Sequence, residues 1–165
     1  MGTPASRIPL LPSLIDRLID REPRNRNEAA SAQTHSLREV KNSLRRDLEW
    51  LLNTRRTPEE PDVSARELWR SVYCYGLPDV SALPLSHVEG QQRLVRLLEA
   101  AIAAFEPRLT NVSVTLLPVA VQAKLLRFRI EALLRMEPAP ERIFFDTTLE
   151  LTSGRYEVEA DARAR

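Results

Sequence analysis

The feature that most constrains the fold of this chain is a change of hydrophobic period at Pro107. Before this proline, apolar residues such as Leu94 and Leu98 recur at the spacing of an α-helix. After it, Val112 and Val114 alternate with polar residues, as in a half-buried β-strand. Proline lacks an amide hydrogen and clashes with the preceding helical turn, so the helix must end here. The chain therefore turns from helix to strand at a single corner.

Strand-like alternation continues to the C-terminal region. The alternating positions are Val112, Val114 and Leu116; Leu126, Phe128, Ile130 and Ala132; Ile143, Phe145, Thr147, Leu149 and Leu151; and Tyr156 and Val158. Ser153-Gly154 predicts a two-residue hairpin turn before the last segment. Strands with one apolar and one polar face are typical of an antiparallel sheet that is covered on one side.

Helical signals lie upstream of the corner. Capping boxes at Ser36–Glu39 and Ser86–Glu89 predict two helix starts, each followed by an apolar stripe. Residues 12–20 predict a shorter amphipathic helix. The fold class is therefore α+β, with N-terminal helices packed on one face of a C-terminal antiparallel β-sheet.

The chain of 165 residues is long enough for one compact domain with its own core. Residues 1–35 are predicted to hold the short helix and a polar linker. Residues 36–159 are predicted to form the single α+β domain, and 160–165 a disordered tail.

Composition excludes several classes of protein. Lys and Arg number 24 against 23 Asp and Glu, which argues against a general nucleic-acid binder. No apolar run is long enough to span a bilayer, and the N-terminus does not read as a secretory signal. A single cysteine, Cys74, permits no internal disulfide, so we expect a cytoplasmic, reducing location.

We find no catalytic, cofactor-binding or metal-binding set in the sequence. His35 and His87 each follow or adjoin a helix start and are predicted to be surface residues. Cys74 is predicted to be a buried thiol rather than a nucleophile. Four glycines leave no phosphate-cradling loop. The sequence therefore predicts a protein that is not an enzyme and needs no cofactor.

The triplet Glu-Pro-Arg occurs twice, at 22–24 and at 106–108. The first copy lies in a polar stretch and reads as a helix stop. The second lies at the helix-to-strand corner, where Pro107 would hold Glu106 and Arg108 on a rigid bend. Charged groups that are already held rigid lose little entropy on docking, so they can specify a partner. The alternative is that both pair with charges inside the subunit.

Two further surfaces are candidates for partner binding. The arginines of "LRRDLEWLLNTRR" are either a solvated face, partly neutralised by Asp47 and Glu49, or an interface with a protein. The narrow apolar stripe of the 12–20 helix either packs on its own sheet or docks into a partner. The residues concerned are Arg45, Arg46, Arg55 and Arg56, and Leu14 and Leu18.

The order of these pieces resembles a known family. "SLIDRLID", "SLREVKNSLRRDLEWLLNTRR", "SVYCYGLPDVS", "FEPRLTNVSV" and the C-terminal strands together are similar to the TssE family, over roughly residues 11–159. TssE proteins are baseplate subunits of the bacterial type VI secretion system, within the baseplate-wedge family of contractile phage tails. Family members have sometimes carried a lysozyme-like label, which the missing catalytic set does not support.

This resemblance implies a structural role in the baseplate wedge, in the cytoplasm near the inner membrane. It implies TssF- and TssG-like partners, with TssK and the spike complex as further neighbours. It also implies contact with the sheath subunits TssB and TssC, whose polymerisation would start by strand addition. No nucleic acid, membrane insertion or cofactor is implied. The family's Glu-Pro-Arg motif maps to Glu106, Pro107 and Arg108, as a partner-binding element.

Two alternatives from other classes stay open at this stage. A peptidoglycan-acting enzyme would need paired carboxylates, for which Glu22 and Glu59 are the candidates. A nucleic-acid-binding module would use the region from Arg45 to Arg56.

Overall fold

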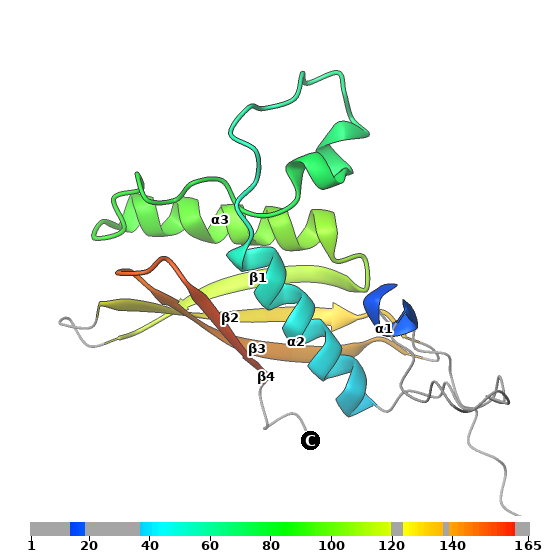
Figure 1. The fold of residues 1–165 in the computed structure, drawn as a ribbon. Helices are drawn as coiled ribbons and strands as arrows, with labels where there is room; N and C mark the ends of the chain where they lie inside the picture. Colours follow the sequence, from blue (N-terminus) through cyan, green and yellow to red (C-terminus); the bar gives the residue numbers. More distant parts are fainter. Residues whose placement is uncertain (1–13, 19–36, 120–123, 137–138, 161–165) are drawn as a thin grey trace, which may run out of the picture.

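The computed structural model describes residues 14–18, 37–119, 124–136 and 139–160 (Figure 1). Its helices are α1 (Leu14–Leu18), α2 (Leu37–Asn53), the 3₁₀ turns η1 (Leu68–Arg70) and η2 (Val72–Cys74), and α3 (Val88–Phe105). Its strands are β1 (Leu109–Leu117), β2 (Leu125–Leu134), β3 (Glu141–Glu150) and β4 (Tyr156–Ala160). Helices precede strands, so the predicted α+β class is confirmed.

The four strands form one antiparallel sheet in the order β1-β2-β3-β4. Ile130 at the middle of β2 lies opposite Val114 of β1 and Phe145 of β3. All three side chains are buried, which confirms the alternation read from the sequence. The sheet is a meander, so β1 and β4 are its edges.

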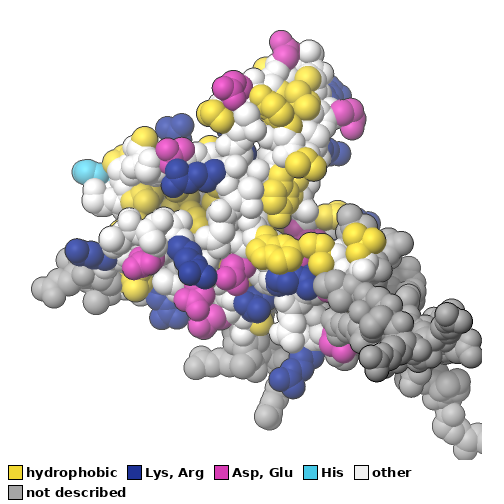
Figure 2. Space-filling model, in the orientation of Figure 1, with side chains coloured by type: hydrophobic (Ala, Val, Ile, Leu, Met, Phe, Trp, Pro, Cys, Tyr) yellow, Lys and Arg dark blue, Asp and Glu magenta, His cyan; other side chains and the backbone are white. Residues whose placement is uncertain are grey.

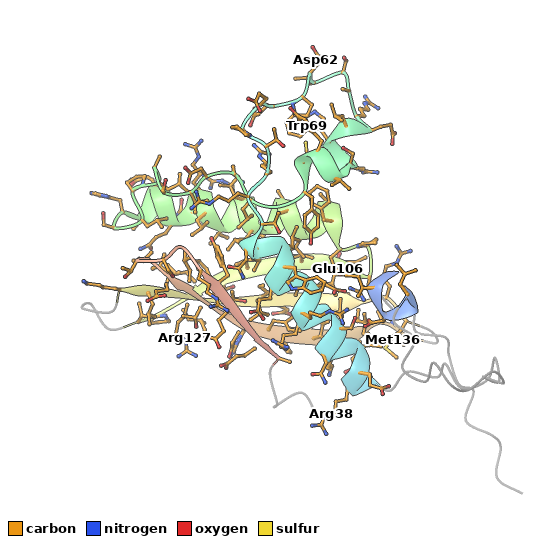
Figure 3. The ribbon with its side chains drawn as sticks, in the orientation of Figure 1. Arg38, Asp62, Trp69, Glu106, Arg127 and Met136 are labelled. Carbon is orange, nitrogen blue, oxygen red and sulfur yellow. The ribbon has the colours of Figure 1, made fainter. Side chains whose placement is uncertain are left out.

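Both long helices cover the same face of the sheet. Figure 1 shows α3 running along β1, while α2 crosses in front of the strands and packs against β4. The core lies between these layers. It includes Val40, Leu44, Leu48, Leu51 and Leu52 of α2, Leu94, Leu98, Ala101 and Ile102 of α3, and the inward side chains of the strands. The opposite face carries polar residues, and Figure 3 shows Arg127 pointing away from the helices.

The predicted two-residue hairpin between β3 and β4 is wrong in length. The Glu150 amide donates to the Arg155 carbonyl at 3.0 Å, so the loop between them is wider than Ser153-Gly154. The Ser153 hydroxyl donates to the Glu150 carboxylate at 2.6 Å and accepts from the Arg155 amide at 3.2 Å. These side-chain bonds stabilise the wider loop, in which Gly154 has a φ of 69°.

The capping box predicted at Ser86–Glu89 is also wrong. The N-cap of α3 is His87, which makes no side-chain cap bond. Its amide donates to the Pro84 carbonyl at 2.9 Å, which leaves Ser86 in the preceding turn, and the Ser86 hydroxyl lies 3.0 Å from His87 Nδ1. The box at Ser36 lies outside the described residues, as does His35.

Helix α3 ends where the proline requires. Phe105 is its last residue, and Glu106 follows with φ −119° and ψ 82°, outside helical geometry. Cys74 is buried, as predicted. Among the described helices none is long and apolar enough to cross a membrane. The boundaries predicted at residues 35 and 160 stay predictions.

Gly76 allows the chain after η2 to approach the end of α2. Its φ is 104°, and the Leu77 amide donates to the Thr54 carbonyl at 2.8 Å. A Cβ at position 76 would lie 2.3 Å from that carbonyl oxygen. Only glycine fits here, because both the backbone angle and the space exclude a side chain.

We expect Gly76→Ala to lower the free energy of unfolding by about 2–4 kcal/mol, since strain and a backbone clash add. Gly154→Ala is the matched control, because φ is also positive there but nothing lies within 4 Å of the added Cβ. It should cost about 1 kcal/mol. Urea unfolding midpoints of the two variants measure this, and equal midpoints would contradict the proposed clash.

Candidate functional site

The helix-to-strand corner at Glu106–Arg108 holds the most connected polar cluster that the structure describes. The Glu106 amide donates to the Ile102 carbonyl at 2.9 Å, and the Leu109 amide donates to the Glu106 carbonyl at 3.1 Å. Pro107 lies between these bonds and faces solvent. The backbone therefore passes from α3 into β1 within a single fixed turn.

Glu106 and Arg108 pair with each other across the proline. Arg108 Nε donates to Glu106 Oε1 at 2.7 Å, and Arg108 Nη2 donates to Oε2 of the same carboxylate. The Arg108 amide also donates to Oε1, at 3.1 Å. Glu106 is only 5% exposed. The pair is a bidentate, buried bridge, which is the strongest geometry that Arg and a carboxylate form.

The pair is tied to α2 through Asp47. Arg108 Nη2 donates to Asp47 Oδ2 at 2.7 Å, and Arg46 donates to the other carboxylate oxygen at 3.0 Å. Figure 3 shows Glu106 beside α2, on the side of the molecule where α1 lies. One guanidinium thus joins the end of α3, the start of β1 and the middle of α2.

The same network continues to α1. Arg46 Nη1 donates to Asp16 at 2.9 Å, and the Ser43 hydroxyl donates to the same carboxylate. Arg46 also lies over the Trp50 ring, 5.3 Å from its centroid, as in a cation–π pair. The described part of the 12–20 helix therefore contacts α2 of its own chain through Asp16. Packing of its apolar stripe on the sheet or on a partner stays a prediction.

Electrostatics keep the central arginine charged. Burial is the largest influence on the pKa of Arg108 and acts to lower it. The hydrogen bonds and charges of Glu106 and Asp47 outweigh burial, so the pKa is raised above its ordinary value. For Arg46, the hydrogen bond to Asp16 is the main cause of a raised pKa. Both arginines of the cluster therefore carry their charge.

The structure divides the sequence-predicted arginines. Arg46 belongs to the cluster, whereas Arg45 pairs with Glu49 at 3.1 Å. Arg55 and Arg56 lie beyond the end of α2, and Arg56 pairs with Glu60 at 2.7 Å. These contacts favour intramolecular neutralisation, one of the two options left open for them.

Of the two apolar candidates, only Leu18 has a described side chain. Leu18 is 73% exposed, and the side chain of Leu14 lies outside the described part. Figure 2 shows further apolar side chains gathered on the same side of the molecule, toward the segment that carries η1 and η2. The exposed large residues there and nearby are Trp50, Val63, Leu68, Val72 and Tyr73.

Sequence reasoning missed three members of the cluster, namely Asp16, Ser43 and Asp47. Asp47 was read only as a charge that neutralises its neighbours. Asp47 lies three residues after Leu44 and next to Leu48, both of which are buried in α2. A carboxylate at the border of a buried stripe is stabilised by a cation from another element, so this position could have indicated a partner. The rival triplet at residues 22–24 lies outside the described residues.

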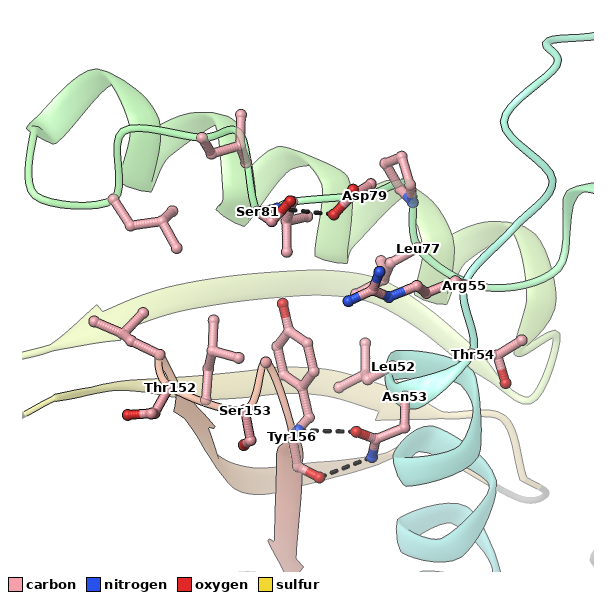
Figure 4. Close-up of a pocket in the computed structure, with 17 residues that line it drawn as sticks. Leu52, Asn53, Thr54, Arg55, Leu77, Asp79, Ser81, Thr152, Ser153 and Tyr156 are labelled. Carbon is pink, nitrogen blue, oxygen red and sulfur yellow. Dashed lines mark hydrogen bonds between the residues drawn. The ribbon is translucent and has the colours of Figure 1, made fainter.

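A groove of about 390 Å³ lies at the other end of α2, between the Leu77–Leu85 segment and the β3–β4 loop (Figure 4). Arg55 and Asp79 lie on its rim, and Leu52 and Leu149 line it. Tyr156 also lines it, and its buried hydroxyl has no hydrogen-bond partner among the described residues. Burial raises the pKa of Tyr156 above its ordinary value.

No group of three His, Cys, Asp or Glu that could hold a metal occurs in the described ranges. The described residues thus offer an ionic cluster that fixes a corner, an apolar surface and a groove.

Comparison with known proteins gives one match. A family model described as "Baseplate wedge protein gp25" matches residues 38–139. The matched range contains α3, β1, β2 and nearly all of α2, with the whole Glu106–Arg108 corner. No curated protein and no solved structure shows significant similarity.

A double-mutant cycle tests the buried bridge. Glu106→Gln alone leaves the Arg108 charge buried with less compensation, so we expect a loss of about 3–5 kcal/mol in the free energy of unfolding. Glu106→Gln combined with Arg108→Met removes both charges and should cost less than the two single changes added together. Urea unfolding of the four proteins measures the coupling, and strictly additive costs would show that the bridge contributes nothing.

An alkaline titration tests the burial of Tyr156. The unfolded chain ionises its tyrosines near pH 10, whereas folded Tyr156 keeps its proton. Above that pH the unfolded state binds fewer protons, so the free energy of unfolding falls as pH rises. We expect Tyr156→Phe to weaken this dependence. Near-ultraviolet phenolate absorbance should show one tyrosine that ionises only as the protein unfolds, and free ionisation of all three would contradict this.

Proposed function

The chain belongs to the baseplate wedge protein gp25 family, and from this premise we propose that it is a structural subunit of a type VI secretion baseplate. Membership supports a structural role in a phage-tail-like baseplate. The finer assignment to the type VI system rests on the TssE-like segments of the sequence. In this role the protein is not an enzyme and acts through its surfaces.

The observation that carries the proposal is the family match, which spans the helices and strands around the Glu106–Arg108 corner. The matched residues include α3, β1, β2 and nearly all of α2, with the whole Glu106–Arg108 corner. A wedge subunit must hold its neighbours at a fixed angle. Buried ionic bridges between α3, β1 and α2 supply that rigidity, because they fix three elements at one point.

We assign the Glu-Pro-Arg triplet two linked tasks. Glu106 and Arg108 hold the corner from inside, and the exposed Pro107 presents it to a neighbouring subunit. Docking onto a bend that is already fixed loses little conformational entropy, which favours a specific contact. Arg45, Arg55 and Arg56, together with Leu14 and Leu18, extend this candidate partner surface along α2 and α1.

The partners in this proposal are TssF- and TssG-like wedge subunits, with TssK and the spike complex nearby. The sheath subunits TssB and TssC would start to polymerise on the sheet of this protein by strand addition. The protein would act in the cytoplasm, in a baseplate near the inner membrane, without nucleic acid or cofactor.

Co-expression with TssF- and TssG-like proteins tests the proposal. We expect the tagged chain to retain both through purification and size-exclusion chromatography. A chain that elutes alone when all three are soluble would overturn the assignment.

Paired variants test the triplet. Glu106→Ala with Arg108→Ala should keep a folded core, because the paired charges leave together and Asp47 keeps its ion pair with Arg46, yet reduce assembly with the wedge and sheath subunits. Glu22→Ala with Arg24→Ala is the matched control, since it changes the same letters in the other copy, and it should assemble normally. Circular dichroism reports folding, and pull-down reports assembly. Normal assembly of the 106/108 variant would remove the triplet from the interface.

A further inference from the structure

The two edges of the sheet are not equivalent. An edge strand carries unpaired main-chain N–H and C=O groups, which are a template for another strand unless something occupies them. β1 and β4 are the edges here. The side chains that already bond to each edge strand decide which edge could accept another strand.

The β4 edge is occupied by side chains of α2. Asn53 Nδ2 donates to the Tyr156 carbonyl at 2.8 Å, and the Tyr156 amide donates to Asn53 Oδ1 at 2.9 Å (Figure 4). One side-chain amide thereby takes both hydrogen bonds that a neighbouring strand would make at this residue. Further along, Arg45 Nη1 lies 3.4 Å from the Val158 carbonyl oxygen. This edge is closed from within.

The β1 edge carries a contact to α3 that a partner could displace. The Val114 amide donates to the Glu99 carboxylate of α3 at 2.8 Å, so it points away from β2. Outward amides recur every second residue in an antiparallel strand, so the Leu116 amide points the same way. The register from Ser113 to Leu117 is regular, because the bulge lies before it, at Asn111 with φ 52°.

The sequence of β1 lacks the usual protection of an edge. Leu109–Leu117 contains no charged residue and no proline, whereas β4 carries Glu157 and Glu159. Charges and prolines are the common devices that prevent pairing with other chains.

We propose that β1, over residues 113–117, is the edge that accepts an incoming strand of a sheath subunit, and that Glu99 holds its place until that strand arrives. This inference rests on the proposed function and names the edge that performs it. The incoming segment is extended and places apolar side chains beside Val114 and Leu116, on the core face. A Lys or Arg in it pairs with the Glu99 carboxylate once that carboxylate leaves the Val114 amide.

The decisive variant is Leu116→Pro, which removes an outward amide without removing a hydrogen bond to β2. Leu116→Ala is its matched control, because it loses the same side chain and keeps the amide. We expect Leu116→Pro to bind co-expressed TssB and TssC at least about tenfold more weakly than Leu116→Ala. Equal binding by the two folded variants overturns the inference and leaves the proposed function intact.

Amide hydrogen exchange on the unmodified protein gives a second measurement that needs no variant. In the free protein we expect the Leu116 amide to exchange quickly and the Tyr156 amide slowly. In the complex, protection should appear at Leu116. Protection that appears only along β4 would overturn the choice of edge. No binding of TssB and TssC at all would overturn the proposed strand addition itself.

Discussion

The Arg108 guanidinium is the group on which the rest of the structure depends. It bonds to Glu106 at the end of α3 and to Asp47 in the middle of α2, while its own backbone leads into β1. Elsewhere the helices and the sheet are joined by apolar packing, which has no strong directional preference, and by separate contacts such as those of Asn53 and Glu99. Hydrogen bonds to a planar guanidinium do have direction. The ionic cluster therefore fixes how the layers meet, whereas the core makes them stay together.

Much of this fold follows from periodicity in the sequence. The change of period at Pro107 locates the corner, and alternation along 125–134 and 141–150 locates the two central strands. These features are predictable because they depend on local geometry and burial. Two features were not predictable, because each depends on a serine hydroxyl whose partner no propensity identifies. Ser153 bonds to Glu150 in the β3–β4 loop, and Ser86 bonds to His87 at the start of α3.

The candidate site was predictable only in part. The triplet Glu106–Arg108 stands out because a proline fixes it at a corner, but its partner Asp47 lies 61 positions away from Arg108. Long-range pairing of charges leaves no periodic signal, so the sequence alone left both internal pairing and partner binding open. The structure places both side chains inside, which moves any contact with a neighbour to the exposed Pro107 and the surface around it.

The side-chain amide of Asn53, which bonds to Tyr156 of β4, has a consequence for how other chains could extend the sheet. A sheet that can extend at both edges has no direction and could start two polymers, or join two nuclei side by side. A sheet with one edge filled by its own side chain can extend only from the other. Strand addition to this subunit, as proposed above, would therefore proceed in one direction only.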